Sequence, residues 1–110
     1  MSQRVDVGKF FQNLNRPKVG ERFDVLLQHG NVVIERIVSS SQIEPKEYIQ
    51  EQDEWVLLLD GYASLDVDGE VVELEKGDYL FIPAKTPHTV KKLTDDALWL
   101  AIHIHPTDAT

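Results

Sequence analysis

Four polar side chains of this 110-residue chain have the types and spacing of a site for a divalent metal ion and a small molecule. Tyr48 and Gln50 are two positions apart, so on an extended segment their side chains point the same way, about 6–7 Å apart. Glu54 joins that face if a bend or bulge intervenes, and His88 begins a later extended segment. A glutamine oxygen, a carboxylate and an imidazole suit a hard or borderline divalent ion. The sequence therefore predicts Gln50, Glu54 and His88 as metal ligands and Tyr48 as a substrate-binding residue.

The same residues have plainer interpretations, and the sequence alone leaves them open. Glu54 could form a salt bridge at a strand end, His88 could be a loop histidine after Pro87, and Gln50 could be exposed to solvent. Tyr48 could pack against its neighbours or hydrogen-bond to a metal ligand rather than ligate the metal itself. A cavity lined by these groups could bind a small molecule without metal, and a glutamate–histidine pair could perform general acid–base chemistry such as isomerisation.

A second imidazole could come from the last predicted strand. By alternation, His103 shares a face with Trp99 and Ala101, while the opposite face carries only leucine and isoleucine between residues 98 and 104. The second face looks more like a core, which would turn His103 outward. Other predicted strands are apolar on both faces, however, so alternation alone does not decide which way His103 points. If His103 points inward, the predicted metal set becomes Gln50, Glu54, His88 and His103.

The segments that must position these residues are strands separated by short turns. Alternation and β-branched residues predict about eight of them, and Asp68-Gly69 is a strong two-residue hairpin signal. The predicted strands cover residues 21–28, 32–38, 55–59, 62–67, 71–74, 79–82, 88–93 and 97–105. Residues 55–59 are apolar on both faces, so we expect both sides of that strand to be covered. The pattern predicts an all-β jelly-roll barrel of two antiparallel sheets.

Two spaced motifs within residues 45–92 resemble those of the small single-domain cupins. Glu54, six residues and Gly61 match the second half of the first cupin motif, and Gly77, five residues, Pro83 and then His88 match the second motif. The resemblance implies the cupin barrel, with a metal ion and a small molecule bound inside it.

The chain departs from the cupin pattern at the positions that matter for metal binding. A standard cupin site looks like three histidines and one glutamate. Here Tyr48 and Gln50 stand where the first motif has histidines, Lys85 replaces a glycine of the second motif, and Lys92 replaces its late asparagine. The sequence thus resembles a cupin subgroup without an agreed activity.

Composition limits the classes of function. The formal net charge is −8, which disfavours nucleic acid and anionic membrane surfaces as partners. Cysteine is absent, which excludes disulfides, thiolate catalysis and cysteine metal ligands. We expect an N-terminal arm over residues 1–20, a cupin domain over residues 21–110, a cytoplasmic location and a homodimer.

Three functions are compatible with these residues. The first is a metal-binding cupin, of enzymatic type, that acts on a small polar molecule. The alternative is a non-catalytic module that binds or senses a small ligand with a degenerate metal site. The third is a structural dimer whose cavity is vestigial.

Overall fold

A computed structural model describes residues 6–107 and contains nine β-strands in that range. The strands are β1 (Glu21–His29), β2 (Val32–Ser39), β3 (Glu47–Tyr48), β4 (Asp53–Asp60), β5 (Ala63–Val67), β6 (Glu70–Leu74), β7 (Tyr79–Ile82), β8 (His88–Leu93) and β9 (Leu98–Ile104). Within the described range, no helix is long and apolar enough to cross a membrane.

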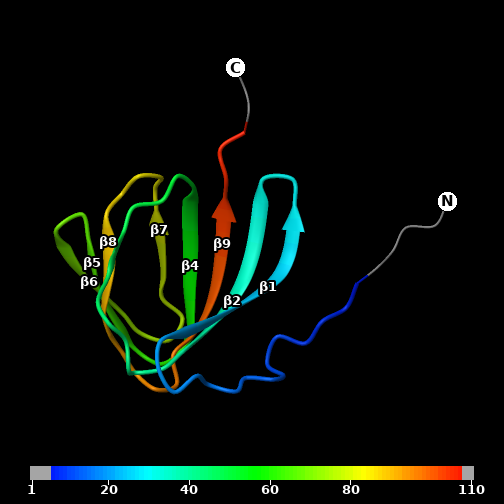
Figure 1. Cartoon of the computed structure of the whole chain (residues 1–110), viewed down its shortest axis with the longest axis horizontal. Coiled ribbons are helices and arrows are strands. Elements are labelled where there is room, and N and C mark those ends of the chain that lie inside the picture. Colours follow the sequence, from blue (N-terminus) through cyan, green and yellow to red (C-terminus); the bar gives the residue numbers. More distant parts are fainter. Residues whose placement is uncertain (1–5, 108–110) are drawn as a thin grey trace.

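The strands form two antiparallel sheets that face one another as a barrel (Figure 1). The first sheet has the order β1-β2-β9-β4-β7, and the second has the order β3-β8-β5-β6. The all-β jelly-roll prediction is therefore confirmed. β3 is an addition to the predicted strands: it has only two residues, too few for a pattern, and it pairs with β8 at the edge of the second sheet.

The barrel is filled by the inward-facing rows of both sheets. Val56 and Leu58 of β4 face the interior and are buried, whereas Trp55 and Leu57 of the same strand are only half-buried on the outer face. The inner row of β4 packs in one cluster with residues of both sheets, such as Leu65 of β5. Period-two alternation thus assigns inner and outer faces even in the apolar stretch of β4, residues 55–59.

Two turns require their glycines for different reasons. At Gly61 the backbone has φ 85°, and an added Cβ would lie 2.6 Å from the Thr94 hydroxyl and 2.8 Å from the Ala97 Cα. Asp68 and Gly69 both have positive φ, 50° and 86°, as expected for the tight hairpin turn that joins β5 and β6. These turns fix the strand register that positions the interior side chains.

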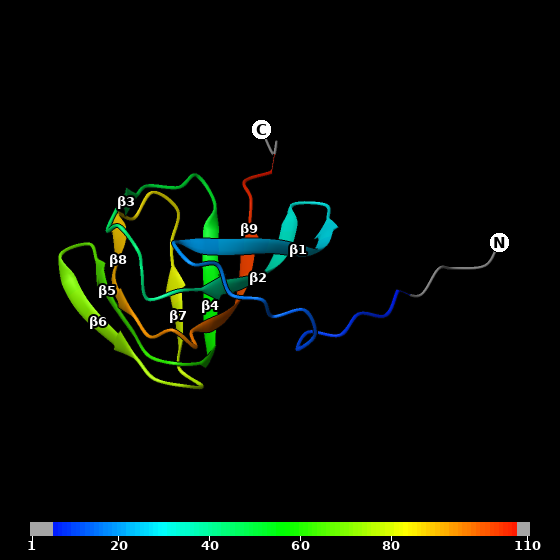
Figure 2. The same cartoon turned by 60° about the horizontal axis from the view of Figure 1, so that its bottom comes forward.

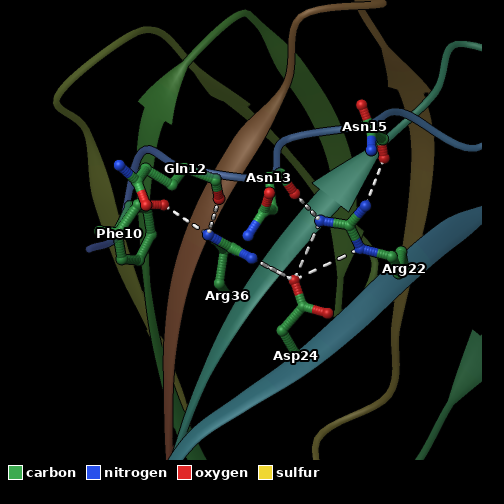
Figure 3. Close-up of polar contacts among 7 residues, drawn as sticks. All are labelled: Phe10, Gln12, Asn13, Asn15, Arg22, Asp24 and Arg36. Carbon is green, nitrogen blue, oxygen red and sulfur yellow. Dashed lines mark hydrogen bonds and ion pairs between the residues drawn. The ribbon is translucent and has the colours of Figure 1, made fainter. Parts of the chain in front are cut away.

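Backbone carbonyls of the segment before β1 accept hydrogen bonds from arginine side chains of the first sheet (Figure 3). Arg36 of β2, 8% exposed, donates to the carbonyls of Phe10 and Gln12 at 2.6 and 2.7 Å. The same guanidinium donates twice to one carboxylate oxygen of Asp24, at 3.0 and 2.8 Å. Asp24 therefore orients Arg36, and Arg36 in turn binds the backbone of the segment before β1.

Arg22 joins the same cluster of contacts on the same side of β1. We call the contacts of Asp24, Arg36 and Arg22 with the backbone of residues 10–15 the clasp. Its guanidinium donates to the carbonyls of Asn13, at 2.7 Å, and Asn15, and also to Asp24 (Figure 3). The described residues before Phe10 run away from the barrel (Figure 2). The division into an arm up to residue 20 and a domain from residue 21 stays a prediction.

We predict that Asp24→Asn lowers stability and flattens its acid dependence. Hydrogen bonds from Arg36 and then Arg22 hold the pKa of Asp24 below its usual 3.8. A lowered pKa in the folded state means that this carboxylate stabilises the fold above pH about 4 and that the contribution is lost as pH falls below it. Because the pair is partly exposed, we expect a cost of about 1 kcal/mol, or roughly 4–8 °C in Tm.

The measurement is thermal unfolding between pH 2.5 and 7, with Asp68→Asn as the control. Asp68 is exposed and occupies a left-handed turn position that asparagine also tolerates. Equal Tm values for wild type and Asp24→Asn at pH 7 would contradict the stabilising role of the clasp.

Candidate functional site

A cavity of about 270 Å³ lies between the two sheets. Most of its wall is apolar and is supplied by both sheets, and Tyr48 and Phe23, both substantially exposed, line it where β3 and β1 end the two sheets. One group of its lining residues is polar: Glu21, Glu35, Gln50, Glu54, His88 and His103. The cavity therefore combines an apolar wall with a cluster of carboxylates and imidazoles.

Glu54 is the centre of the polar cluster. It lies on the inner face of β4, opposite His103 of β9 and Ile82 of β7, and it is 7% exposed. Its Oε1 accepts a hydrogen bond from the Gln50 amide at 3.1 Å. The Nε2 atoms of His88 and His103 lie 3.9 and 3.7 Å from its two oxygens, too far for hydrogen bonds. A buried carboxylate with one hydrogen bond within residues 6–107 is poorly compensated.

His88 begins β8 and is oriented by the loop before it. Its Nδ1 lies 2.9 Å from the carbonyl of Thr86, which can only accept, so Nδ1 carries the proton. Nε2 is then the basic nitrogen, and it is the one that faces Glu54. This arrangement, with one nitrogen donating to a backbone carbonyl, is the one that metal-binding histidines usually show.

His103 points inward, and its surroundings differ from those of His88. It is 9% exposed, together with the buried Trp99 and Ala101, whereas Leu100 and Ile102 are half-buried on the outer face. Burial thus shows which way His103 points, a question that alternation in the sequence leaves open.

Both ring nitrogens of His103 are engaged. Nε2 lies 2.7 Å from Oε1 of Glu35, and Nδ1 lies 3.3 Å from the amide nitrogen of Gln52. His103 is thus brought to the site with Gln50, Glu54 and His88, but with a partner of its own.

Tyr48 lies at the rim rather than in the cluster. Its ring stacks on His88 with centroids 6.0 Å apart and an interplanar angle of 28°, because the two residues are paired across β3 and β8. The Lys46 ammonium lies 5.4 Å from the centre of the same ring. Tyr48 is 43% exposed, so it can cover a bound molecule without being a metal ligand.

Sequence reasoning missed Glu35 and Glu21. Both face the cavity on predicted strands, and alternation with Ile37 and Phe23 could have indicated this. Glu21 accepts a hydrogen bond from the Ser39 hydroxyl at 2.7 Å. Burial raises the pKa of Glu21, the Ser39 hydrogen bond partly offsets this, and the charge of Glu54 adds to it. The cluster therefore contains three carboxyl groups in unlike environments.

The polar side chains of the cavity are of the types that bind metal ions, but they are not arranged as a complete coordination sphere. Among residues 6–107, no three histidine, aspartate or glutamate side chains are arranged to hold a metal ion. Glu54 and His88 present a basic oxygen and a basic nitrogen to the same space, whereas His103 is engaged by Glu35. Glu54 and His88 are therefore positioned to ligate a metal ion, and His103 lies nearby in a hydrogen bond to Glu35.

Comparison with known proteins identifies the family. The family model of the cupin domain matches residues 35–105, which include Glu35, Gln50, Glu54, His88 and His103. The chain belongs to the cupin family. The resemblance inferred from the two motifs is thus confirmed.

Curated relatives share part of this cupin. It is 32% identical over 77 residues to a quercetin 2,3-dioxygenase of Bacillus subtilis, which covers 70% of this chain and 20% of that protein. It is 34% identical over 56 residues to an uncharacterised protein of Methanocaldococcus jannaschii, covering 51% and 43% of the two chains. The chain thus spans less than half the length of either relative.

A solved structure matches the whole barrel. A candidate mannose-6-phosphate isomerase of Ralstonia eutropha JMP134 is 28% identical, with a TM-score of 0.80 over 93% of this cupin and 100% of that chain. The barrel and its strand order are therefore shared along nearly the full length.

The loop before His88 gives a prediction about Lys85, which stands where the second cupin motif has glycine. Lys85 has φ 62°, and its amide donates to the carbonyl of Gln50 at 2.6 Å, so the left-handed turn is tied to the loop that carries Gln50. We expect Lys85→Val to cost at least about 1 kcal/mol, because a β-branched residue is strained at positive φ. Lys85→Gly should stay within about 0.5 kcal/mol of wild type, since relief of strain offsets the added entropy of the unfolded chain.

Urea unfolding of the purified variants checks this difference. Lys92→Val is the control, because Lys92 is exposed on β8, where a β-branched residue is favoured. The ion pair of Lys85 with Glu51, 4.0 Å apart and exposed, contributes little to either variant. Equal stabilities of Lys85→Val and Lys85→Gly would show that the backbone at this position is not strained.

Proposed function

We propose that this cupin binds a small polar molecule in its barrel, together with a divalent metal ion at the polar cluster. The observation that carries the proposal is Glu54, a buried carboxylate with one hydrogen bond within the described residues and two imidazole nitrogens at 3.7 and 3.9 Å. A buried charge in this state gains most from a cation placed beside it.

Glu54 and His88 are the residues that would hold the metal first. Gln50 and His103 are the further donors, Gln50 by turning its amide oxygen inward and His103 by leaving Glu35. When bound, such an ion acts as a Lewis acid toward a ligand oxygen or lowers the pKa of a bound water. Stacking on Tyr48 and donation to the Thr86 carbonyl keep the His88 ring in place.

The rest of the cavity supports binding of a small molecule with an apolar body. Its volume of about 270 Å³ is close to the lower end of the usual range for ligand pockets. Trp99 lines it, and the buried indole N–H of Trp99 has no hydrogen-bond partner within residues 6–107.

An enzymatic role is the more specific form of this proposal. The quercetin 2,3-dioxygenase relative supports it, as does the candidate mannose-6-phosphate isomerase, because both names denote enzymes. The alternative is a non-catalytic module that binds or senses a small ligand without metal. The engagement of His103 by Glu35 favours that alternative, because it removes one imidazole from the donor set.

We expect untagged protein to bind Zn²⁺ or Mn²⁺ with a stoichiometry near one per chain, measured by elemental analysis and by titration after chelation. Glu54→Gln and His88→Gln should each weaken binding at least 10-fold, because each removes a ready ligand. His29→Gln is the control, since His29 lies exposed at the end of β1.

Metal binding that is unchanged in Glu54→Gln and His88→Gln would contradict the proposed metal site. Retention of a small molecule by the metal-free protein, detected by mass spectrometry of the native protein, would favour the ligand-binding alternative instead.

We also propose that two copies associate through the outer face of the first sheet. Tyr79 and Phe81 of β7 are 67% and 51% exposed, and they pair with Leu57 and Trp55 on the same face of β4. Ile104 of β9 is 40% exposed and continues this apolar surface. A second copy offers an identical apolar surface, which is what a two-fold interface needs.

Sedimentation at micromolar concentration should give the mass of a dimer for wild type and of a monomer for Phe81→Glu, because the charge would be buried in the interface. Val71→Glu is the matched control: Val71 is 72% exposed but lies on β6 of the other sheet. A monomeric wild type would contradict the dimer.

A further inference from the structure

Glu35 occupies the cavity from a strand outside both cupin motifs. It lies on β2 opposite Ala101 of β9, so it is the diagonal neighbour of His103, which pairs with Val33. The Glu35 side chain is 18% exposed, and its Oε1 lies 2.7 Å from Nε2 of His103. This distance is that of a short hydrogen bond, and it is 1 Å less than the distance from Nε2 to Glu54.

The hydrogen-bond pattern determines which nitrogen of His103 carries the proton. A carboxylate can only accept, so Nε2 donates to Glu35. The amide nitrogen of Gln52 can only donate, so Nδ1 accepts from it. An imidazole nitrogen that donates a proton cannot at the same time ligate a metal. His103 is therefore occupied at the nitrogen that faces the cavity.

His88 has the opposite arrangement. Its proton is on Nδ1, given to Thr86, and in the described part of the chain no hydrogen bond is made by Nε2. The two imidazoles flank the same carboxylate at nearly equal distances, 3.9 and 3.7 Å. They differ in whether an acidic side chain engages the inward nitrogen.

We propose that the hydrogen bond to Glu35 keeps His103 from ligating the metal, so that the cavity binds a metal ion through Glu54 and His88 without the imidazole of His103, and that Glu35 thereby sets the metal affinity of the site. This rests on the metal site proposed above. Glu35 acts through His103 and is a positioning residue. Without it, His103 becomes a third ligand.

The test is a double-mutant cycle of Glu35→Gln and His103→Gln, read as the Zn²⁺ dissociation constant at one pH by competition with a chromophoric chelator. In wild type, His103→Gln should change the constant less than 3-fold. In the Glu35→Gln background it should weaken binding at least 10-fold. The loss of one negative charge near the metal affects both Glu35→Gln proteins equally, so it cancels in the cycle.

Two controls accompany the cycle. Glu70→Gln removes the same charge from an exposed position on β6 and should leave the effect of His103→Gln unchanged. Circular dichroism and Tm establish that each protein is folded. Nitrogen-15 spectra of the metal-free wild type should show a proton on Nε2 of His103 and on Nδ1 of His88, the opposite tautomers.

The outcomes separate this inference from the proposed function. A loss of at least 10-fold for His103→Gln in wild type would show that His103 ligates beside Glu35 and would overturn the inference. So would an equally small effect in both backgrounds, or an unprotonated Nε2 of His103 in the spectra. Absence of Zn²⁺ binding in all four proteins would overturn the metal site itself, and the inference with it.

Discussion

The register between neighbouring strands is the constraint on which the site depends. Antiparallel pairing places Glu54 directly opposite His103 across β4 and β9, and Tyr48 directly opposite His88 across β3 and β8. Partners in such a ladder share a face of the sheet. A slip of one residue in β4 would turn Glu54 outward and put Asp53 or Trp55 in its place. The polar cluster thus exists only in this register.

The register is itself maintained by contacts outside the strands. Two backbone amides of loop 83–87 donate hydrogen bonds toward the start of β4: Lys85 to the carbonyl of Gln50 before the strand, and Ala84 to the carboxylate of Asp53, its first residue, at 2.8 Å. These hydrogen bonds help to place Gln50, from the loop between β3 and β4, beside Glu54 and His88, which come from different sheets. Lys85 adopts a left-handed conformation that glycine would adopt more easily, so the departure from the cupin motif adds backbone strain at this position.

The fold was predictable because its signals are local: period-two alternation and turn residues such as Asp68-Gly69. The positions of Glu54 and His88 in the barrel were predictable because the spacing of the two motifs fixes them relative to the turns. The inward direction of His103 was not, since both faces of β9 are apolar and only burial distinguishes them. Glu35 and Gln52 as partners of His103 come from distant segments, 68 and 51 positions away, and no local pattern encodes such pairings.

The charges in the cavity explain why one carboxylate matters more than the others. No lysine or arginine is among the described residues that line it, whereas three glutamates are. His103 donates a hydrogen bond to Glu35, and burial raises the pKa of Glu21 while its hydrogen bond from Ser39 lowers it. Glu54 has only the Gln50 amide as a hydrogen-bond donor within residues 6–107. Of the three glutamates that line the cavity, Glu54 is the one that is buried, so the electrostatic demand for a cation is greatest at Glu54, next to the basic nitrogen of His88.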